Sequence, residues 1–329
     1  MMKYYNLLFS STLIISTLIS ISSNSWMGMW LGLEINLLSI IPLMNSSKNP
    51  LSAEASIKYF SSQALASIIL LFSIIFMSQN MNYLMILIFN SSLLTKLGSA
   101  PFHFWFPEVM EGLSWINCMI MLTWQKISPM VIISYNFNSN LFYFCIIVSN
   151  MLISGLMGIN QVSLRKIMAY SSINHIGWML SSLYFMDTIW SMYFLIYSTM
   201  TVMIVSIFWK MSFFYVKQLI TFSKNKVSNK LFLSMNFLSL GGLPPFIGFL
   251  PKWATIQSII MNQLYLMAFI MVISTLVTLY FYIKLMLNFL SINLKTLKFH
   301  APIVQNMTFS LNFIFVSLIS LLTLSINLF

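Results

Sequence analysis

The sequence has 329 residues, of which 59% are hydrophobic and only 6% charged, with 16 basic residues against 5 acidic ones. A soluble globular domain of this size cannot stay in solution with so few charged groups, so the composition predicts an integral membrane protein. Nearly continuous apolar runs such as 64–77 and 267–281 exclude the alternating pattern of a β-barrel. The predicted fold class is therefore all-α, a polytopic bundle of transmembrane helices.

About eleven hydrophobic spans follow one another along the chain, separated by short polar breaks. The first begins at Tyr4 without a cleavable leader, so we expect it to be kept as a helix. The longest segment between spans, Lys210–Lys230, is too short for a globular domain, and we expect one transmembrane domain over 1–329. The predicted spans are 4–22, 25–44, 58–78, 82–100, 113–134, 141–160, 166–185, 188–209, 231–250, 264–290 and 308–328.

The basic residues predict how this bundle is oriented. Thirteen of the 16 lie before the first span, in alternate loops or in the span ends that flank these loops, whereas the other loops carry no Lys or Arg. Basic loops face the cytoplasmic or matrix side, so the N-terminus is expected there, and an odd number of spans places the C-terminus on the opposite side. Those thirteen residues are Lys3, Lys48, Lys58, Arg165, Lys166, Lys210, Lys217, Lys224, Lys226, Lys230, Lys284, Lys295 and Lys298.

Four charged residues fall within or at the edge of the spans: Glu34, Lys96, Lys126 and Lys252. A charge at the bilayer centre costs about 3 kcal/mol on insertion scales, so each needs a partner, water or a function. Desolvation disfavours the charged form of a lysine, so a buried lysine can exchange protons near neutral pH. One interpretation is an ion pair that holds the bundle together, but three lysines exceed the single clearly intramembrane carboxylate. The other interpretation is a proton path.

Prolines lie close to all three of these lysines. Proline lacks the N–H group and displaces a carbonyl four residues earlier, so we expect broken helices with free carbonyls beside the lysines. Such backbone is tolerated at membrane depth only inside protein or beside a water-filled cavity. The helix-breaking residues predicted here are Pro101, Pro129, Pro244, Pro245 and Pro251.

His175 is the one histidine deep inside a predicted span, where it lies on a polar face with Ser171 and Ser182. A backbone carbonyl that satisfies the imidazole and a role in proton relay explain this placement equally well. Glu108 and Glu111 follow the fourth span, where we expect them to be solvated or paired with loop lysines.

A weak internal repeat supports the broken helices. The segment 101–107 and the segment 245–251 both begin Pro-Phe and have proline again six positions on. They lie at the C-terminal ends of the fourth and ninth spans, which cross the bilayer in opposite directions. This arrangement predicts inverted repeats of the kind in which transporters flank an ion site with broken helices.

Five stretches resemble one family closely: 24–37, 96–107, 123–129, 172–178 and 236–246. Through them the whole chain resembles the antiporter-like subunits of respiratory complex I, NADH:ubiquinone oxidoreductase, and among these the chain 2 family in its bilaterian-animal, insect form. The resemblance implies a single antiporter-like domain from which three N-terminal helices have been lost. It also implies that Glu34 pairs with Lys96, and that Lys126 and Lys252 continue a hydrated axis in the membrane plane.

The resemblance further implies a function, in which electron transfer from NADH to ubiquinone elsewhere in the complex drives proton movement along this axis. NADH, FMN, iron–sulfur clusters and ubiquinone are then expected in other subunits. This chain has no Gly-rich dinucleotide fingerprint and only two cysteines, so we expect it to bind no cofactor and no metal. Its implied partners are neighbouring antiporter-like and other membrane-arm subunits and lipids such as cardiolipin, not nucleic acid.

The implied location is the mitochondrial inner membrane, with the N-terminus in the matrix and the C-terminus in the intermembrane space. Two other functions stay open. The chain is either a proton-translocating subunit, a structural spacer without its own proton path, or a free-standing cation/proton antiporter.

Overall fold

The structure is a computed structural model that describes residues 2–45, 49–79, 83–137, 140–221, 227–244 and 246–290. Within these ranges the regular secondary structure is helical, apart from an isolated antiparallel bridge between Ser163 and Tyr215. It divides into two compact units, Met1–Ile146 and Ile147–Phe329, which are described in turn. The predicted eleventh span, 308–328, lies outside the described residues.

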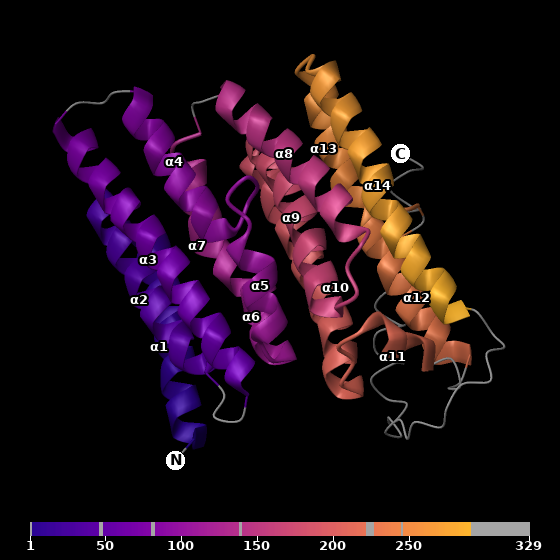
Figure 1. Ribbon diagram of the computed structural model, residues 1–329. Coiled ribbons are helices and arrows are strands. Elements are labelled where there is room, and N and C mark those ends of the chain that lie inside the picture. The colour runs from indigo at the N-terminus through magenta and orange to yellow at the C-terminus, as the bar shows by residue number, and fades with distance from the viewer. Residues whose placement is uncertain are drawn as a thin grey trace. The chain divides into compact units, whose positions relative to one another are not determined.

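In the first unit, α3 is the central helix, because it contacts α2, α4 and α5 (Figure 1). α1 packs against α2, and α7 contacts both α1 and α4. The Ser25 hydroxyl caps α2 by accepting from the Gly28 N–H at 3.2 Å. The helices are α1 (Met2–Ser22), α2 (Trp26–Met44), α3 (Pro50–Gln79), α4 (Tyr83–Leu97), α5 (Trp105–Gly112), α6 (Trp115–Leu122), the 3₁₀ turn η1 (Trp124–Lys126) and α7 (Ile127–Ser134).

In the second unit, α9 is the central helix. It contacts α10, α13 and α14, and nearly every one of its residues is buried. α12 packs against α10 and α14 (Figure 1). The helices are α8 (Asn140–Gly158), which begins in the first unit, α9 (Leu164–Leu183), α10 (Asp187–Met211), α11 (Val216–Thr221), α12 (Val227–Gly241), α13 (Phe249–Met261) and α14 (Tyr265–Leu290).

The predicted polytopic helical membrane fold is confirmed. Among the described residues, seven helices are long and apolar enough to cross a membrane: Tyr4–Ser22, Trp26–Met44, Pro50–Ser78, Trp115–Ser134, Leu141–Gly158, Asp187–Met211 and Tyr265–Leu287. α4 is a shorter apolar helix. α9 is long enough to cross but carries too many polar side chains to reach the same hydropathy.

Three predicted spans are interrupted, as the prolines close to Lys96, Lys126 and Lys252 predicted, although each span is predicted as one continuous range. The span 82–100 ends at Leu97, and α5 occupies part of the segment expected to be a loop. The span 113–134 is divided by η1. The span 231–250 ends at Gly241, and α13 begins at Phe249. The outer two interruptions begin at Gly98 and Gly242, which have φ values of 71° and 75°, a left-handed conformation that ends a helix.

Candidate functional site

The second break, between α12 and α13, has the geometry of a glycine-terminated helix. The Gly242 N–H donates to the Ser239 carbonyl at 3.0 Å, and the Leu243 N–H donates to the Leu238 carbonyl at 3.3 Å. This pair of bonds is the Schellman motif, which requires a left-handed residue at the position of Gly242. Carbonyls of the last turn that have no such donor, including that of Gly241, remain available to other groups.

Lys252 donates hydrogen bonds to these free carbonyls. It lies in the first turn of α13 with 6% of its surface exposed, and its ammonium donates to the Gly241 carbonyl at 2.8 Å and to the Leu240 carbonyl at 3.5 Å. The ammonium also lies 5.9 Å from the centre of the Trp178 ring. A side chain at position 242 would meet the lysine, because a Cβ on Gly242 would lie 2.7 Å from Lys252 Cδ.

The energies explain why a lysine is tolerated there. The C-terminal end of a helix carries partial negative charge from its free carbonyls, which attracts a cation. A hydrogen bond to a charged group contributes about 1.5–3 kcal/mol net. That is similar to the roughly 2.5–3.5 kcal/mol needed to place a lysine at the bilayer centre. The end of α12 therefore offsets much of the cost of burying Lys252.

The first break, between α4 and α5, repeats the cap. The Gly98 N–H donates to the Thr95 carbonyl and the Ser99 N–H donates to the Leu94 carbonyl, both at 3.1 Å. Lys96 lies in the last turn of α4. A positive charge there interacts favourably with the partial negative charge at the C-terminal end of the same helix. Its side chain is 9% exposed.

Glu34 belongs to the same unit as Lys96 and acts on it electrostatically. The two described side chains do not form an ion pair, since no Nζ–Oε distance between them is 4.0 Å or less. The Glu34 Oε1 atom is buried without a hydrogen-bond partner. The family resemblance implied a Glu34–Lys96 pair; the geometry brings the two charges into one region without direct contact.

Lys126 is the last residue of η1 and is 2% exposed. Two features form the turn that holds it. Pro129 lies in the first turn of α7, where its missing N–H costs least, and the chain before it tightens so that the Lys126 N–H donates to the Thr123 carbonyl at 3.3 Å. The side-chain amides of Gln125 and Asn36 also bond reciprocally, at 3.0 and 3.1 Å, which ties the turn to α2.

His175 lies on α9 in the second unit, 4% exposed. Its Nδ1 is hydrogen bonded to the Tyr193 hydroxyl at 2.9 Å, with the donor set by the tautomer of the imidazole. The partner at this nitrogen is therefore a side chain of α10. The sequence had left a backbone carbonyl and a relay role open, and this contact decides neither.

The remaining predicted helix-breaking residues lie at the breaks themselves. Pro101 follows Gly98 within the first break, and its bond to Ala100 is cis. Pro244 lies in the turn after Gly242 and Pro251 in the first turn of α13. Pro245 lies outside the described residues.

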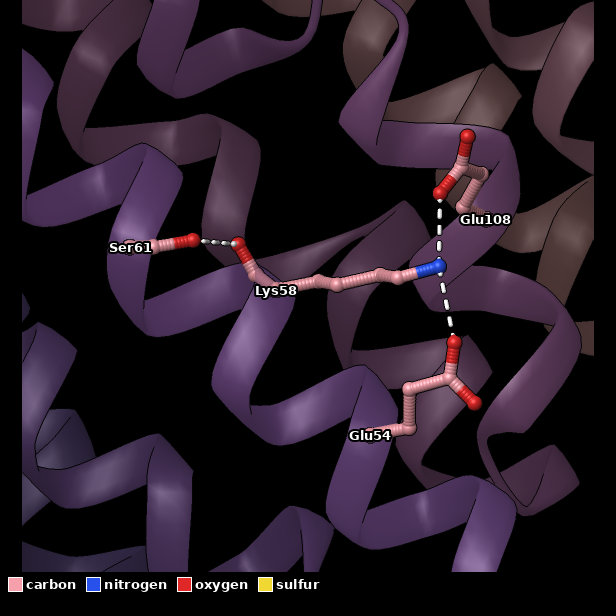
Figure 2. Close-up of polar contacts among 4 residues, drawn as sticks. All are labelled: Glu54, Lys58, Ser61 and Glu108. Carbon is pink, nitrogen blue, oxygen red and sulfur yellow. Dashed lines mark hydrogen bonds and ion pairs between the residues drawn. The ribbon is translucent and has the colours of Figure 1, made fainter.

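A three-residue cluster lies beside the first break. The Lys58 ammonium on α3 contacts a Glu54 oxygen at 2.9 Å and a Glu108 oxygen of α5 at 2.8 Å (Figure 2). All three side chains are well exposed, between 42% and 59%. Glu108 was expected to be solvated or paired with a loop lysine; it is exposed and paired, but its partner Lys58 lies within the extended α3.

α5 is also held by packing and by one hydrogen bond. A Cβ on Gly112 would overlap the backbone of Leu51 on α3, so the two helices approach closely there. The Trp105 ring packs edge-on against Tyr59 of α3, and its Nε1 donates to the Thr95 carbonyl at 3.0 Å. α5 therefore holds the last turn of α4, next to Lys96, against α3.

Sequence reasoning missed Gly98, Gly242, Asn36, Gln125 and Tyr193. Signals existed for the two glycines, because each precedes a proline by three positions in the repeated segments. The other three pair across long sequence distances and leave no local pattern. Within the described residues, no group of three or more His, Cys, Asp or Glu side chains is placed to hold a metal ion.

The chain is similar to proteins of a known family. Residues 23–278 match the family described as NADH:quinone oxidoreductase/Mrp antiporter, TM. A protein named NADH-ubiquinone oxidoreductase chain 2 from Anopheles gambiae is 53% identical over 89% of this chain and 88% of its own length. The protein of the same name from Aedes aegypti is 50% identical over 99% and 98%.

Solved structures share the fold. A chain of respiratory complex I from Thermus thermophilus with bound aureothin superposes with a TM-score of 0.87 at 20% identity, covering 99% of this chain and 79% of that one. A chain of the Mrp complex from Dietzia superposes with a TM-score of 0.71 at 16% identity, covering 83% and 58%.

Proposed function

The chain belongs to the NADH:quinone oxidoreductase/Mrp antiporter transmembrane family, as its sequence motifs predicted, and we propose that it is a proton-translocating subunit in the membrane arm of respiratory complex I. One observation carries the proposal furthest. The buried Lys252 ammonium is bound to the free Gly241 carbonyl at the end of a broken helix, at 2.8 Å. Lys252 is held by carbonyl dipoles and the Trp178 ring, and no carboxylate of the described residues forms an ion pair with it, so it can lose its proton without leaving a counter-charge behind.

The proposed mechanism uses the same electrostatics at each lysine. When Lys252 is protonated, its ammonium is attracted to the end of α12, and when it is neutral that attraction falls. Moving positive charge onto Lys126 repels a proton on Lys96 and favours its transfer. The proposed path consists of Glu34, Lys96, Lys126, His175 and Lys252 in one antiporter-like domain.

The proposed setting follows from the names of the relatives. We place the chain in the mitochondrial inner membrane, with its N-terminus in the matrix and its C-terminus in the intermembrane space. Its partners are the other membrane-arm subunits and the surrounding lipid, including cardiolipin. The enzyme as a whole oxidises NADH, and the cofactors and ubiquinone are bound by other subunits, so this chain contributes no redox chemistry.

Replacement of Lys126 by Met tests the proposal. Met keeps most of the apolar volume but cannot carry a proton, so we expect the complex to assemble and to lose proton translocation, measured in liposomes with NADH and a quinone. Lys217→Met, which removes the same charge from an exposed position on α11, is the matched control and is expected to translocate normally. An assembled Lys126→Met complex with normal translocation per NADH oxidised would leave a structural spacer as the better description.

The antiporter alternative makes a different prediction. A free-standing antiporter exchanges cations for protons when this chain alone is reconstituted in liposomes. We expect no exchange from the isolated chain, since numerous large apolar side chains on its described surface suit contact with partner subunits as well as lipid. Exchange that depends on Lys126 in the isolated chain would favour the antiporter.

A further inference from the structure

The central helix of the second unit carries more polar side chains than its burial would lead one to expect. Its four serine hydroxyls are satisfied within α9 itself. The Ser171 and Ser172 hydroxyls donate to the carbonyls of Met168 and Ala169 at 2.8 and 2.7 Å. An imidazole cannot make this local bond in the same way, so His175 has to find its partners on other helices.

The partner at Nδ1 is unusual for a buried histidine, because it is a tyrosine hydroxyl. Tyr193 is 1% exposed, and Tyr197, one turn further along α10, is 2% exposed. The Tyr197 ring lies 4.9 Å from the His175 ring, centre to centre. α10 therefore places two tyrosines next to the imidazole, and one of them is hydrogen bonded to it.

Further hydroxyls lie nearby. Tyr197 and Tyr282 are both close enough to Tyr193 to act on it electrostatically, and Tyr282 is 1% exposed. The Tyr197 hydroxyl also interacts with the Ser172 hydroxyl. A phenylalanine at each site would fill the same space without a buried hydroxyl that must be satisfied, so packing alone does not account for three tyrosines here.

We propose that Tyr193 is a proton-relay group that receives the Nδ1 proton of His175 and passes its own hydroxyl proton to a neighbouring tyrosine hydroxyl. The proposal rests on the proposed function, because it extends the path in the second unit. A hydroxyl can donate and accept at once, which an aliphatic or phenyl side chain cannot. The imidazole has the same ability through its two nitrogens.

The transfer balances in protons. A proton binds at Nε2 of a His175 whose Nδ1 carries hydrogen, and the Nδ1 proton moves to the Tyr193 oxygen. The original Tyr193 proton leaves in the same event to the hydroxyl of Tyr197 or Tyr282, and that hydroxyl releases its own proton to a water molecule, so no net charge stays on either tyrosine. One proton enters and one leaves, and no oxidant or reductant is needed.

The test is Tyr193→Phe in the complete complex, reconstituted in liposomes with NADH and a quinone. Phe keeps the ring and removes only the relay oxygen. We expect coupled proton translocation to slow by about 100-fold, the lower end of what a positioned proton-transfer group contributes. Tyr280→Phe on α14, where the side chain is 56% exposed, is the matched control and is expected to leave the rate unchanged.

A second measurement separates relay from positioning. If Tyr193 passes a proton, its loss makes proton transfer the slow step, and the solvent deuterium isotope effect on translocation rises. A hydroxyl that only holds the imidazole in place would leave that isotope effect unchanged, and this result would overturn the proposal.

A second variant keeps the test decisive should Tyr193→Phe fail to assemble. His175→Gln retains an amide that can bond to the Tyr193 hydroxyl but cannot pass a proton on, and we expect the same loss. Full translocation in His175→Gln or in an assembled Tyr193→Phe complex overturns the relay. If the relay variants translocate normally but Lys126→Met abolishes translocation in the same assay, the proposed function stands without the Tyr193 relay. If Lys126→Met also translocates normally, both proposals are wrong.

Discussion

The two broken helices follow one plan but place their lysines differently. Gly98 and Gly242 are 144 positions apart, and so are the first residues of α5 and α13, Trp105 and Phe249. Both glycines have positive φ and make the same pair of capping bonds. In the first break the lysine belongs to the helix that ends, whereas in the second Lys252 reaches back from the helix that begins.

The same spacing shows which residues replace the lysines. The position equivalent to Lys96 in the second repeat is Leu240, and the position equivalent to Lys252 in the first is Glu108. Glu108 is turned to Lys58 on α3 (Figure 2). The feature common to both breaks is therefore a cation near the C-terminal end of the first half-helix, and not a lysine at a fixed sequence position.

The largest expected effect tests whether a cation at the end of the first half-helix is required. Lys252→Met removes the cation from the end of α12, and we expect coupled proton translocation to fall by about 100-fold or more. Adding Leu240→Lys to Lys252→Met moves the lysine to the register of Lys96. The double variant is expected to recover part of the lost translocation in the liposome assay. If the assembled double variant recovers no translocation, the position of the lysine in the sequence matters, and not only the presence of a cation at the helix end.

A smaller effect is expected from the capping glycine. Gly242→Ala forces an alanine to a positive φ, at a cost of about 1–2 kcal/mol, and its Cβ collides with Lys252. We expect lower thermal stability of the complex together with slower translocation. Gly241→Ala is the matched control, because a Cβ there meets nothing nearer than 3.8 Å. Equal effects of the two substitutions would contradict the proposed contact between position 242 and the lysine.

The smallest effect is expected beside the first break. Lys58→Met removes both contacts of the exposed cluster, and because exposed ion pairs are weak and screened by salt, we expect no resolvable change in thermal midpoint. Glu54→Gln, which leaves the Glu108 contact, serves as comparison. A clear loss of stability in Lys58→Met alone would mean that the Glu108 contact, and not Gly112 and Trp105, holds α5 in place.

The sequence predicted the helices, the buried lysines and the approximate positions of the breaks, because each of these depends on residues close together in the chain. The apolar runs located the helices, and the charge of Lys96, Lys126 and Lys252 inside them identified the residues worth following. The sequence also placed the breaks near these lysines, since proline acts on its own helix. Predicted spans nevertheless ran through Gly98 and Gly242, because a glycine is also compatible with continuing helix.

Contacts between distant residues were not predictable in this way. The Asn36–Gln125 amide pair spans 89 positions, and nothing around either residue indicates the other. Segment 101–112 fell between two predicted spans and was expected to be a loop, yet part of it is the helix α5, which packs closely on α3 at Gly112. Tertiary packing overrides local preference at such places.

The burial of α9 has a consequence for how the chain enters the membrane. With Arg165, Asn174 and His175 among its residues, α9 is not one of the helices apolar enough to cross on its own. Three of the helices that it contacts, α10, α13 and α14, follow it along the chain, whereas α8, whose Asn150 and Met151 lie against Gly177, precedes it. During synthesis α9 therefore leaves the ribosome when α8 is its only neighbour of these four, and we expect the insertion machinery to retain it until α14 has been translated.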